Sequence, residues 1–231
     1  MLFLVLGRGK TGSLVAEVAH EHGHSVRVLG EEENHNASAL TGPFLAGFDA
    51  VIDFTTPEAV LPNLRACLAN GARVVVGTTG WYTHLEDMKA LAERKGAGLL
   101  YGTNFSIGVQ AMLRVARELA LAALDYKFSI TETHHVSKKD APSGTALTIK
   151  QVLQAANSAL HVEIISKREG DASGTHVIEA RSQSDVIELK HEAFSRRGFA
   201  EGAVRAAEWI AGKSGVWEFS QVSQQIASTS K

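Results

Sequence analysis

The chain has 231 residues, of which 45% are hydrophobic and 21% charged, a mix that suits one large or two small globular domains. A formal net charge of -2 argues against nucleic acid as the main partner. Cys67 is the only cysteine, so we expect no intramolecular disulfide and no thiolate metal cluster. The apolar start is too short for a signal peptide, and no apolar run reaches the roughly 20 residues of a membrane span. We therefore expect a cytoplasmic protein without a membrane partner.

The first 31 residues carry a dinucleotide-binding pattern. A buried strand is predicted at 2–6, the glycines of G-x-G-x-x-G occupy 7–12, a helix is predicted at 13–21, and a second strand at 25–29. Glu31 follows that strand, 19 residues after the last glycine, where an acid can bind both ribose hydroxyls. The alternative is a glycine-rich turn used only for packing.

The next 75 or so residues repeat the strand–helix alternation. Strands are predicted at 50–54, 73–76 and 98–101, with a helix after Pro57 and another at 84–95. Residues 32–43 are predicted to be a polar loop or a short edge element. Pro62 falls inside the first of these helices and should kink or shorten it. The alternation predicts a doubly wound sheet, which meets its ligand at the carboxyl ends of the strands.

The pattern changes after Asn104. A long helix is predicted at 107–124 and a second at 144–157, among strands predicted at 126–134, 161–167, 175–182 and 185–192. A closing helix at 200–212 is expected to return to the first domain. We therefore predict an α/β protein with a Rossmann-type dinucleotide-binding domain (1–104, joined by 199–231) and an α+β substrate-binding and catalytic domain with a mixed sheet (105–198).

The stretch 132–146 combines a strand end, a polar loop and a helix start. The unpaired N–H groups and the dipole of a helix start favour a carboxylate or phosphate. Gly144 would let an anion approach the backbone, and the hydroxyls of Ser143 and Thr145 would add donors. Lys138 would be the neighbouring cation. The alternative is a polar surface loop.

His134 or His135 would act as the proton carrier of this stretch. Neighbours on a strand point to opposite faces, so one metal ion is not expected to bind both. Glu132 and His134 share a face and could join a site with His176 or His191, but no ligand spacing typical of zinc is present. We predict no metal.

The same stretch resembles the signature of the dihydrodipicolinate reductase family: Glu-x-His-His, a Lys four residues after the first His, then Asp-Ala-Pro-Ser-Gly-Thr-Ala. Further landmarks at 51–55, 77–80, 104–109, 168–170 and 202–205 match that family in order, so the resemblance spans essentially the whole chain. Two features depart from it. The glycine loop is one residue shorter than the common G-x-G-G-x-x-G form, and the segment after Gly174 is shorter than the arm that helps longer relatives form tetramers.

The resemblance implies NAD(P)H-dependent reduction of 4-hydroxy-tetrahydrodipicolinate to tetrahydrodipicolinate in lysine and diaminopimelate biosynthesis. It implies His134 as proton donor or acceptor and Lys138 as second proton donor. The substrate, a small dicarboxylate, would be held by His135, Lys138, Ser143, Gly144 and Thr145. The dinucleotide would be held by Gly7, Arg8, Gly9, Lys10, Thr11, Gly12, Glu31, Gly77, Thr78, Thr79, Gly102, Thr103, Asn104 and Phe105. A homo-oligomer is also implied, a tetramer if the short segment allows it.

The acidic residues after the second strand bear on the choice of cofactor. Many relatives place an arginine after the ribose-binding acid to receive the 2′-phosphate of NADP, and here that position is Glu32. We therefore predict NADH as the cofactor and NADPH as the alternative, since Arg8 and Lys10 could approach the phosphate. Two other functions remain open: a dehydrogenase of another small acid, and a non-catalytic dinucleotide sensor.

Overall fold

The computed structural model describes residues 1–123 and 125–228, which form two compact units. The first contains Met1–Ile107 and the chain from Arg197 onward, and the second contains Gly108–Arg196. The boundaries predicted from the sequence, after residues 104 and 198, lie close to these divisions. Leu124, the predicted end of the long helix, lies outside the described residues.

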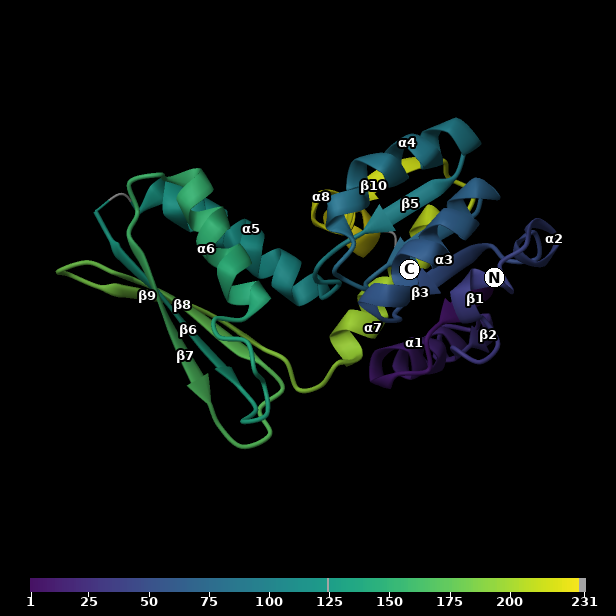
Figure 1. Cartoon of the computed structure of the whole chain (residues 1–231). Helices are drawn as coiled ribbons and strands as arrows, with labels where there is room; N and C mark the ends of the chain where they lie inside the picture. The colour runs from purple at the N-terminus through teal and green to yellow at the C-terminus, as the bar shows by residue number, and fades with distance from the viewer. Residues whose placement is uncertain (124, 229–231) are drawn as a thin grey trace. The chain divides into compact units, whose positions relative to one another are not determined.

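The first unit is built on a six-stranded sheet in the order β10-β5-β4-β3-β1-β2, in which every neighbouring pair is parallel (Figure 1). Its strands are β1 (Leu2–Leu6), β2 (Ser25–Leu29), β3 (Ala50–Asp53), β4 (Arg73–Val76), β5 (Gly98–Tyr101) and β10 (Gly215–Glu218). The central strands are continuous apolar runs because helices cover both of their faces. The predicted Rossmann-type fold is thereby confirmed, and β10 is an addition that its short, half-buried sequence did not predict.

Helices cover both faces of this sheet. One face packs against α1 (Lys10–Glu21), α7 (Arg197–Ile210) and α8 (Phe219–Ser228), and the other against α3 (Pro57–Ala69) and α4 (Leu85–Lys95). Alternate residues of β1 illustrate the division, because Phe3 lies in the first core and Leu4 in the second. The shorter elements are η1 (His35–Ala37), α2 (Gly42–Leu45) and η2 (Tyr82–His84).

Two predictions about helices need correction. Helix α1 begins at Lys10, inside the glycine pattern, and not after it. Gly12 fits there because a Cβ at this position would lie 2.1 Å from the carbonyl oxygen of Gly7. Helix α3 continues through Pro62 to Ala69, so the predicted shortening is wrong. A proline removes one backbone hydrogen bond, and the burial of the apolar face of this helix outweighs that loss.

The second unit contains a mixed four-stranded sheet in the order β7-β6-β8-β9 and two helices. Strands β6 and β7 are parallel, whereas β6–β8 and β8–β9 are antiparallel. The elements are α5 (Ile107–Ala122), β6 (Lys127–His134), α6 (Gly144–Ala156), β7 (Val162–Arg168), β8 (Thr175–Arg181) and β9 (Val186–Glu192). Phe128 and Ile130 of β6 pack in the core with α5 and α6. Glu132 and His134 continue the same face, so the alternation brings polar side chains into the interior.

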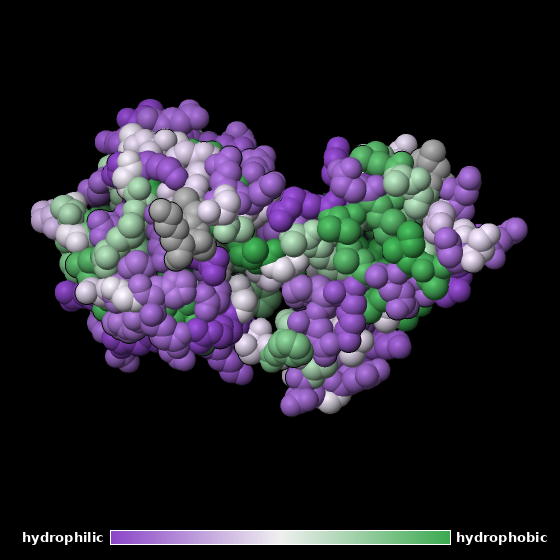
Figure 2. Space-filling view, turned by 180° about the vertical axis from the view of Figure 1, so that it is seen from behind, coloured by the Kyte–Doolittle hydropathy of each residue, from purple (hydrophilic) through white to green (hydrophobic). Residues whose placement is uncertain are grey.

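Apolar side chains are also exposed on the second unit. Val115 and Leu121 of α5 are 51% and 43% exposed, and Figure 2 shows a broad apolar area on this unit. Within the described ranges, no helix is both long enough and apolar enough to span a bilayer.

Candidate active site

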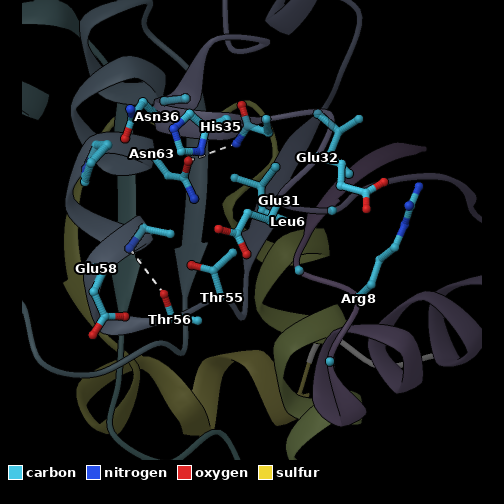
Figure 3. A pocket seen from close by; sticks show the side chains of 18 of the residues that line it. Leu6, Arg8, Glu31, Glu32, His35, Asn36, Thr55, Thr56, Glu58 and Asn63 are labelled. Carbon is cyan, nitrogen blue, oxygen red and sulfur yellow. Dashed lines mark hydrogen bonds between the residues drawn. The ribbon is translucent and has the colours of Figure 1, made fainter.

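A cavity of about 630 Å³ lies beside the glycine loop of the first unit (Figure 3). Gly7 has φ +102°, and a Cβ there would lie 2.2 Å from the carbonyl oxygen of Phe54, so only glycine fits this turn. Gly9 faces open space and caps the start of α1. The first N–H groups of α1 are therefore open to an anionic group such as a pyrophosphate. The residues present fit a dinucleotide.

One wall of the cavity carries acidic side chains. Glu31 and Glu32 line it together with Arg8 (Figure 3). Arg8 forms an ion pair with Glu33, whose carboxylate also accepts a hydrogen bond of 2.8 Å from the backbone N–H of Gly30. The Gly30 bond and then the Arg8 guanidinium hold the pKa of Glu33 below its usual range. The Arg8 cation is thus already neutralised by a protein carboxylate.

A buried carboxylate, that of Asp53, holds two residues that line the cavity, Thr55 and Asn63. Asp53 ends β3, is fully buried and accepts hydrogen bonds from Thr55, Asn63 and Thr78. Burial raises the pKa of Asp53, and these bonds oppose the rise. Thr78, predicted to contact the dinucleotide, is buried with its hydroxyl 2.8 Å from Asp53 Oδ1. Asp53 was not among the predicted site residues.

The remaining predicted dinucleotide contacts lie elsewhere in the first unit. Lys10, Thr11 and Gly12 belong to the first turn of α1, and residues 77–79 and 102–105 follow β4 and β5. Within the described part of the chain, these residues do not line the cavity. The side chain of Phe105 is buried, with its ring centroid 4.5 Å from that of Phe219.

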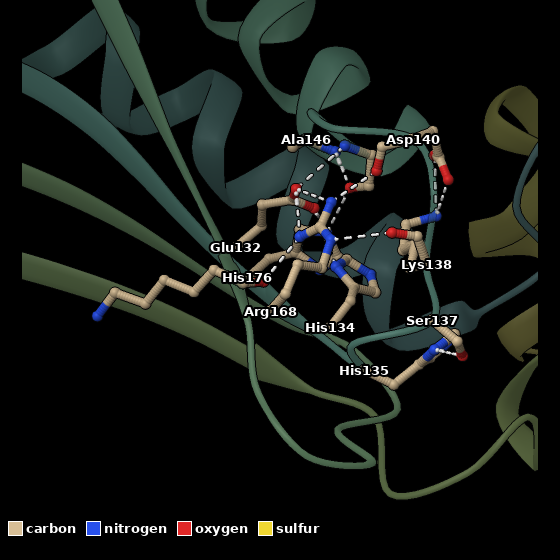
Figure 4. Close-up of polar contacts among 11 residues, drawn as sticks. Glu132, His134, His135, Ser137, Lys138, Asp140, Ala146, Arg168 and His176 are labelled. Carbon is tan, nitrogen blue, oxygen red and sulfur yellow. Dashed lines mark hydrogen bonds and ion pairs between the residues drawn. The ribbon is translucent and has the colours of Figure 1, made fainter.

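A second polar site lies in the second unit, at the end of β6 beside the start of α6 (Figure 4). Its centre is the fully buried Glu132. Glu132 Oε1 accepts a bond of 3.2 Å from the N–H of Ser143 and bonds of 3.2 and 3.1 Å from the Arg168 guanidinium. Burial alone would raise the pKa of Glu132, but hydrogen bonds from Ser143, Ser166 and Arg168 lower it to about 2. The carboxylate is therefore ionised at neutral pH.

His134 is placed next to this carboxylate. Its Nδ1 lies 3.0 Å from Glu132 Oε2, although the alignment is not that of a hydrogen bond. Its Nε2 approaches Gly174, where a Cβ would lie 3.1 Å away. Burial lowers the pKa of His134; Glu132 opposes this, while Lys138 and Arg168 lower it further. The imidazole is thus neutral at pH 7, with Glu132 favouring a proton on Nδ1.

A second imidazole faces the same carboxylate. His176 of β8 is the direct partner of Glu132 in the antiparallel ladder, and its Nε2 lies 4.0 Å from Glu132 Oε2 and 3.2 Å from Ser143 Oγ. Burial, and then the neighbouring His134, lower the pKa of His176 to about 4. The sequence singled out His176 only as a metal ligand that was then set aside.

Arg168 connects the carboxylate to the loop that carries Lys138. Its guanidinium donates to the carbonyl oxygens of Asp140 at 2.6 Å and Lys138 at 3.4 Å. Lys138 Nζ in turn lies 2.8 Å from both carboxylate oxygens of Asp140. Arg168 was not a predicted site residue. It lies opposite His134 in the parallel β6–β7 register, which the sequence alone does not reveal.

The predicted substrate-binding residues are only partly brought together. Ser143 caps α6, and its hydroxyl accepts from the N–H of Ala146 at 3.2 Å, so it serves the fold more than a ligand. Gly144, the first residue of α6, faces open space, as an anion that approaches this helix start requires. His135 lies apart from the Glu132 carboxylate in Figure 4, with its Nδ1 2.7 Å from Ser137 Oγ.

The absence of a metal ion at this site stays a prediction. Donor atoms of Glu132, His134 and His176 lie within 4.8 Å of one another, a spacing that could hold an ion. The Arg168 guanidinium and the Lys138 ammonium flank them, and these cations oppose a divalent ion.

Comparison with known families covers nearly the whole chain. A model described as "Dihydrodipicolinate reductase, N-terminus" matches residues 1–105, and one described as "Dihydrodipicolinate reductase, C-terminus" matches residues 108–222. The 4-hydroxy-tetrahydrodipicolinate reductase of Christiangramia forsetii is 33% identical, covering 96% of this chain and 97% of the relative. That of Natronomonas pharaonis is 37% identical, covering 90% and 94%.

A solved structure supports the fold. Dipicolinate-bound dihydrodipicolinate reductase from Paenisporosarcina sp. TG-14 superposes with a TM-score of 0.80, covering 96% of this chain and 99% of that one, at 24% identity. The family expected from the signature around His134 is therefore confirmed, together with the α/β fold.

Proposed function

Because the chain belongs to the dihydrodipicolinate reductase family, we propose that it reduces 4-hydroxy-tetrahydrodipicolinate with a nicotinamide dinucleotide in lysine and diaminopimelate biosynthesis. One observation supports this most directly. The second unit brings a neutral imidazole and the helix start of α6 to one buried carboxylate, and Arg168 ties the loop that carries the Lys138 ammonium to the same carboxylate. This set suits a ligand that carries two carboxylates and must receive a proton.

We propose that the substrate carboxylates bind at the start of α6 and near Lys138. The N–H groups of the first turn of α6 attract a carboxylate, and Gly144 leaves room for it. The same site fits dipicolinate, a flat dicarboxylate, which the solved relative binds. Thr145 lies in the same turn and is proposed as a further donor, and His135 as a contact at the rim.

Proton delivery is assigned to His134, with Lys138 as the second donor. The neutral imidazole of the free protein gains a proton when two substrate carboxylates approach, because nearby negative charge raises the pKa of a histidine. A bound nicotinamide dinucleotide would supply a hydride to C4 of the conjugated C=N system that forms when the substrate loses its 4-hydroxy group as water. His134 then donates the proton that it has gained on Nε2. This proton neutralises the negative charge that spreads through the conjugated C=N system.

Glu132 and Arg168 act as positioning residues in this scheme. The charge of Glu132 lies 3.0 Å from His134 Nδ1 and favours a proton on that nitrogen, and Arg168 holds both the carboxylate and the backbone of the Lys138 loop. A rigid supporting shell of this kind keeps reacting groups within the narrow range of distances that proton transfer needs.

The dinucleotide is assigned to the first unit, with the glycine loop at its pyrophosphate and Glu31 at its ribose; residues 77–79 and 102–105 are proposed as further contacts. We propose that NADH is preferred over NADPH. Glu31 and Glu32 line the cavity, and Glu33 already neutralises Arg8. A 2′-phosphate would therefore meet carboxylates with no unpaired cation at Arg8 to offset them.

We also propose that the chain forms a homo-oligomer, as its resemblance to tetrameric relatives implies. The short connection between β8 and β9 is the reason to measure the number of subunits directly. Sedimentation equilibrium distinguishes a tetramer from a dimer, and a monomer at all concentrations would contradict the proposal.

The activity is tested by following the loss of NADH absorbance with substrate freshly generated by the synthase of the preceding step. We expect oxidation that depends on the synthase product and is abolished in His134→Gln. Absence of turnover with this substrate, together with turnover of another amino or hydroxy acid, would identify a dehydrogenase of different specificity.

A further inference from the structure

Two histidines and two glutamates of the first unit converge at a place that has no role in the proposed reaction. His22 caps the end of α1, His24 precedes β2, and Glu201 and Glu208 lie on α7. Glu208 Oε1 lies 3.1 Å from His22 Nδ1 and 2.7 Å from His24 Nε2. We refer to these four residues as the His22 cluster. They do not line the cavity beside the glycine loop.

Both ring nitrogens of His22 face carboxylate oxygens, an arrangement that a positive charge at the ring would stabilise. Its Nδ1 faces Glu208 and its Nε2 lies 3.0 Å from Glu201 Oε2, so each ring nitrogen meets a carboxylate. A neutral imidazole has one N–H, and its other nitrogen carries a lone pair. One nitrogen would therefore oppose its lone pair to a carboxylate oxygen unless the ring gains a second proton or a metal ion binds there.

We propose that His22, His24 and Glu208 bind a divalent transition-metal ion of the Zn²⁺ class, and that Glu201 orients His22. The three donor atoms lie within 4.8 Å of one another, and imidazole nitrogen with carboxylate oxygen is a common ligand set for zinc. Glu201 contacts the ring nitrogen that faces away from Glu208, as carboxylates behind metal-bound histidines do. The side chains of His22, His24 and Glu208 are 26%, 12% and 32% exposed, so an ion can enter from solvent.

The surrounding charge favours this cluster over the other triad of the same spacing. Three carboxylates, those of Glu21, Glu201 and Glu208, lie around it against two cations, the Arg197 guanidinium, which pairs with Glu21 and Glu201, and the N-terminal ammonium. The amino group of Met1 lies 3.5 Å from the second nitrogen of His24. At the triad around Glu132, by contrast, the two carboxylates of Glu132 and Asp140 are fully balanced by the two cations Arg168 and Lys138. A divalent ion is therefore stabilised by the net charge at the His22 cluster and opposed at the other triad.

The test is calorimetric titration of the chelator-treated full chain with Zn²⁺ at pH about 7.5. We expect one ion per chain, loss of that binding in Glu208→Gln and in His24→Asn, and roughly tenfold weaker binding in Glu201→Gln. His84→Asn is the matched control, because His84 lies 4.0 Å from Asp87 as a single histidine–carboxylate pair. Far-UV circular dichroism establishes that each variant is folded.

A second readout is thermal unfolding with and without Zn²⁺. An ion bound only by the folded state raises the melting temperature of the wild type and of His84→Asn, and leaves Glu208→Gln unchanged. Wild type without saturable Zn²⁺ binding would overturn the proposal. Binding that survives Glu208→Gln but is lost in His134→Asn would also overturn it, because the ion would then occupy the Glu132 triad. Neither outcome depends on the proposed reductase activity.

Discussion

The two candidate sites differ in what forms them: backbone groups in the first unit and side chains in the second. The cavity of the first unit is shaped by backbone, with Gly7, Gly9 and Gly12 setting the turn and leaving N–H groups open. The site of the second unit is made of side chains that hold one another, around the buried Glu132 and Arg168. A backbone site is damaged by added atoms, whereas a charged network is damaged by a lost partner or a changed proton. The two sites should therefore respond differently to the same kinds of change.

The largest expected effect is on proton delivery in the second unit. We expect His134→Gln and Lys138→Ala each to lower kcat roughly 10²- to 10⁴-fold, as for loss of acid catalysis. Steady-state kinetics with the freshly made substrate, together with NADH titration, measures this. NADH affinity should stay that of the wild type, since both residues lie in the other unit. A rise in KM with unchanged kcat would instead make these residues ligands of the substrate only.

The next effect is on acid stability. His176 has a pKa of about 4 in the fold, against about 6.5 when unfolded, so the unfolded state binds more protons between these values. The contribution of His176 to the free energy of unfolding is complete above pH about 6.5. It falls by on the order of 3 kcal/mol as the pH falls to about 4. Glu132, with a pKa of about 2, adds a loss of stability from pH about 4.5 downward.

Urea unfolding at a series of pH values checks this unit by unit. The three tryptophans, Trp81, Trp209 and Trp217, all belong to the first unit, so their fluorescence reports on that unit, whereas far-UV circular dichroism reports on both. We expect the dichroism midpoint to fall before the fluorescence midpoint on acidification. His176→Asn should flatten the decline between pH about 6.5 and 4. A wild type equally stable at pH 7 and 5 would contradict the charge assignment.

A matched pair of glycines separates the two sites. Gly9 and Gly144 both face open space, so alanine fits the free protein at either position. We expect Gly9→Ala to weaken NADH binding about tenfold, about 1.4 kcal/mol, without changing dipicolinate binding, and Gly144→Ala to do the reverse. Calorimetric titration of both ligands with both variants makes each the control of the other. If one variant lost both ligands, the assignment of one ligand to each unit would fail.

The smallest expected effect is on the choice of cofactor. Glu32→Arg replaces a carboxylate on the cavity wall with a cation, which should narrow the preference for NADH over NADPH in kcat/KM several-fold, or roughly 1 kcal/mol. Glu33→Gln should act in the same direction by releasing Arg8. Wild-type preference for NADPH would show that Arg8 leaves Glu33 for the phosphate.

Local patterns in the sequence were enough to predict much of the molecule. The strand, glycine turn and helix at residues 2–21, and the strand end, loop and helix start around His134 and Lys138, are each encoded within a few turns of chain. Alternation, capping and the need for glycine at a positive φ act between near neighbours, so they can be read without knowing the partners.

Only the tertiary structure determined which distant residues meet. Strand β10 pairs with β5 across more than 100 residues, and its own sequence shows no strand periodicity. Arg168 and His176 reach Glu132 through the registers of β7 and β8, and the His22 cluster forms where α7 packs on α1. Register and helix packing depend on the shape of the whole core, and a single residue carries no local mark of its eventual partner. The strand end and loop that carry His134 and Lys138 were therefore predictable, and the network of distant residues around them was not.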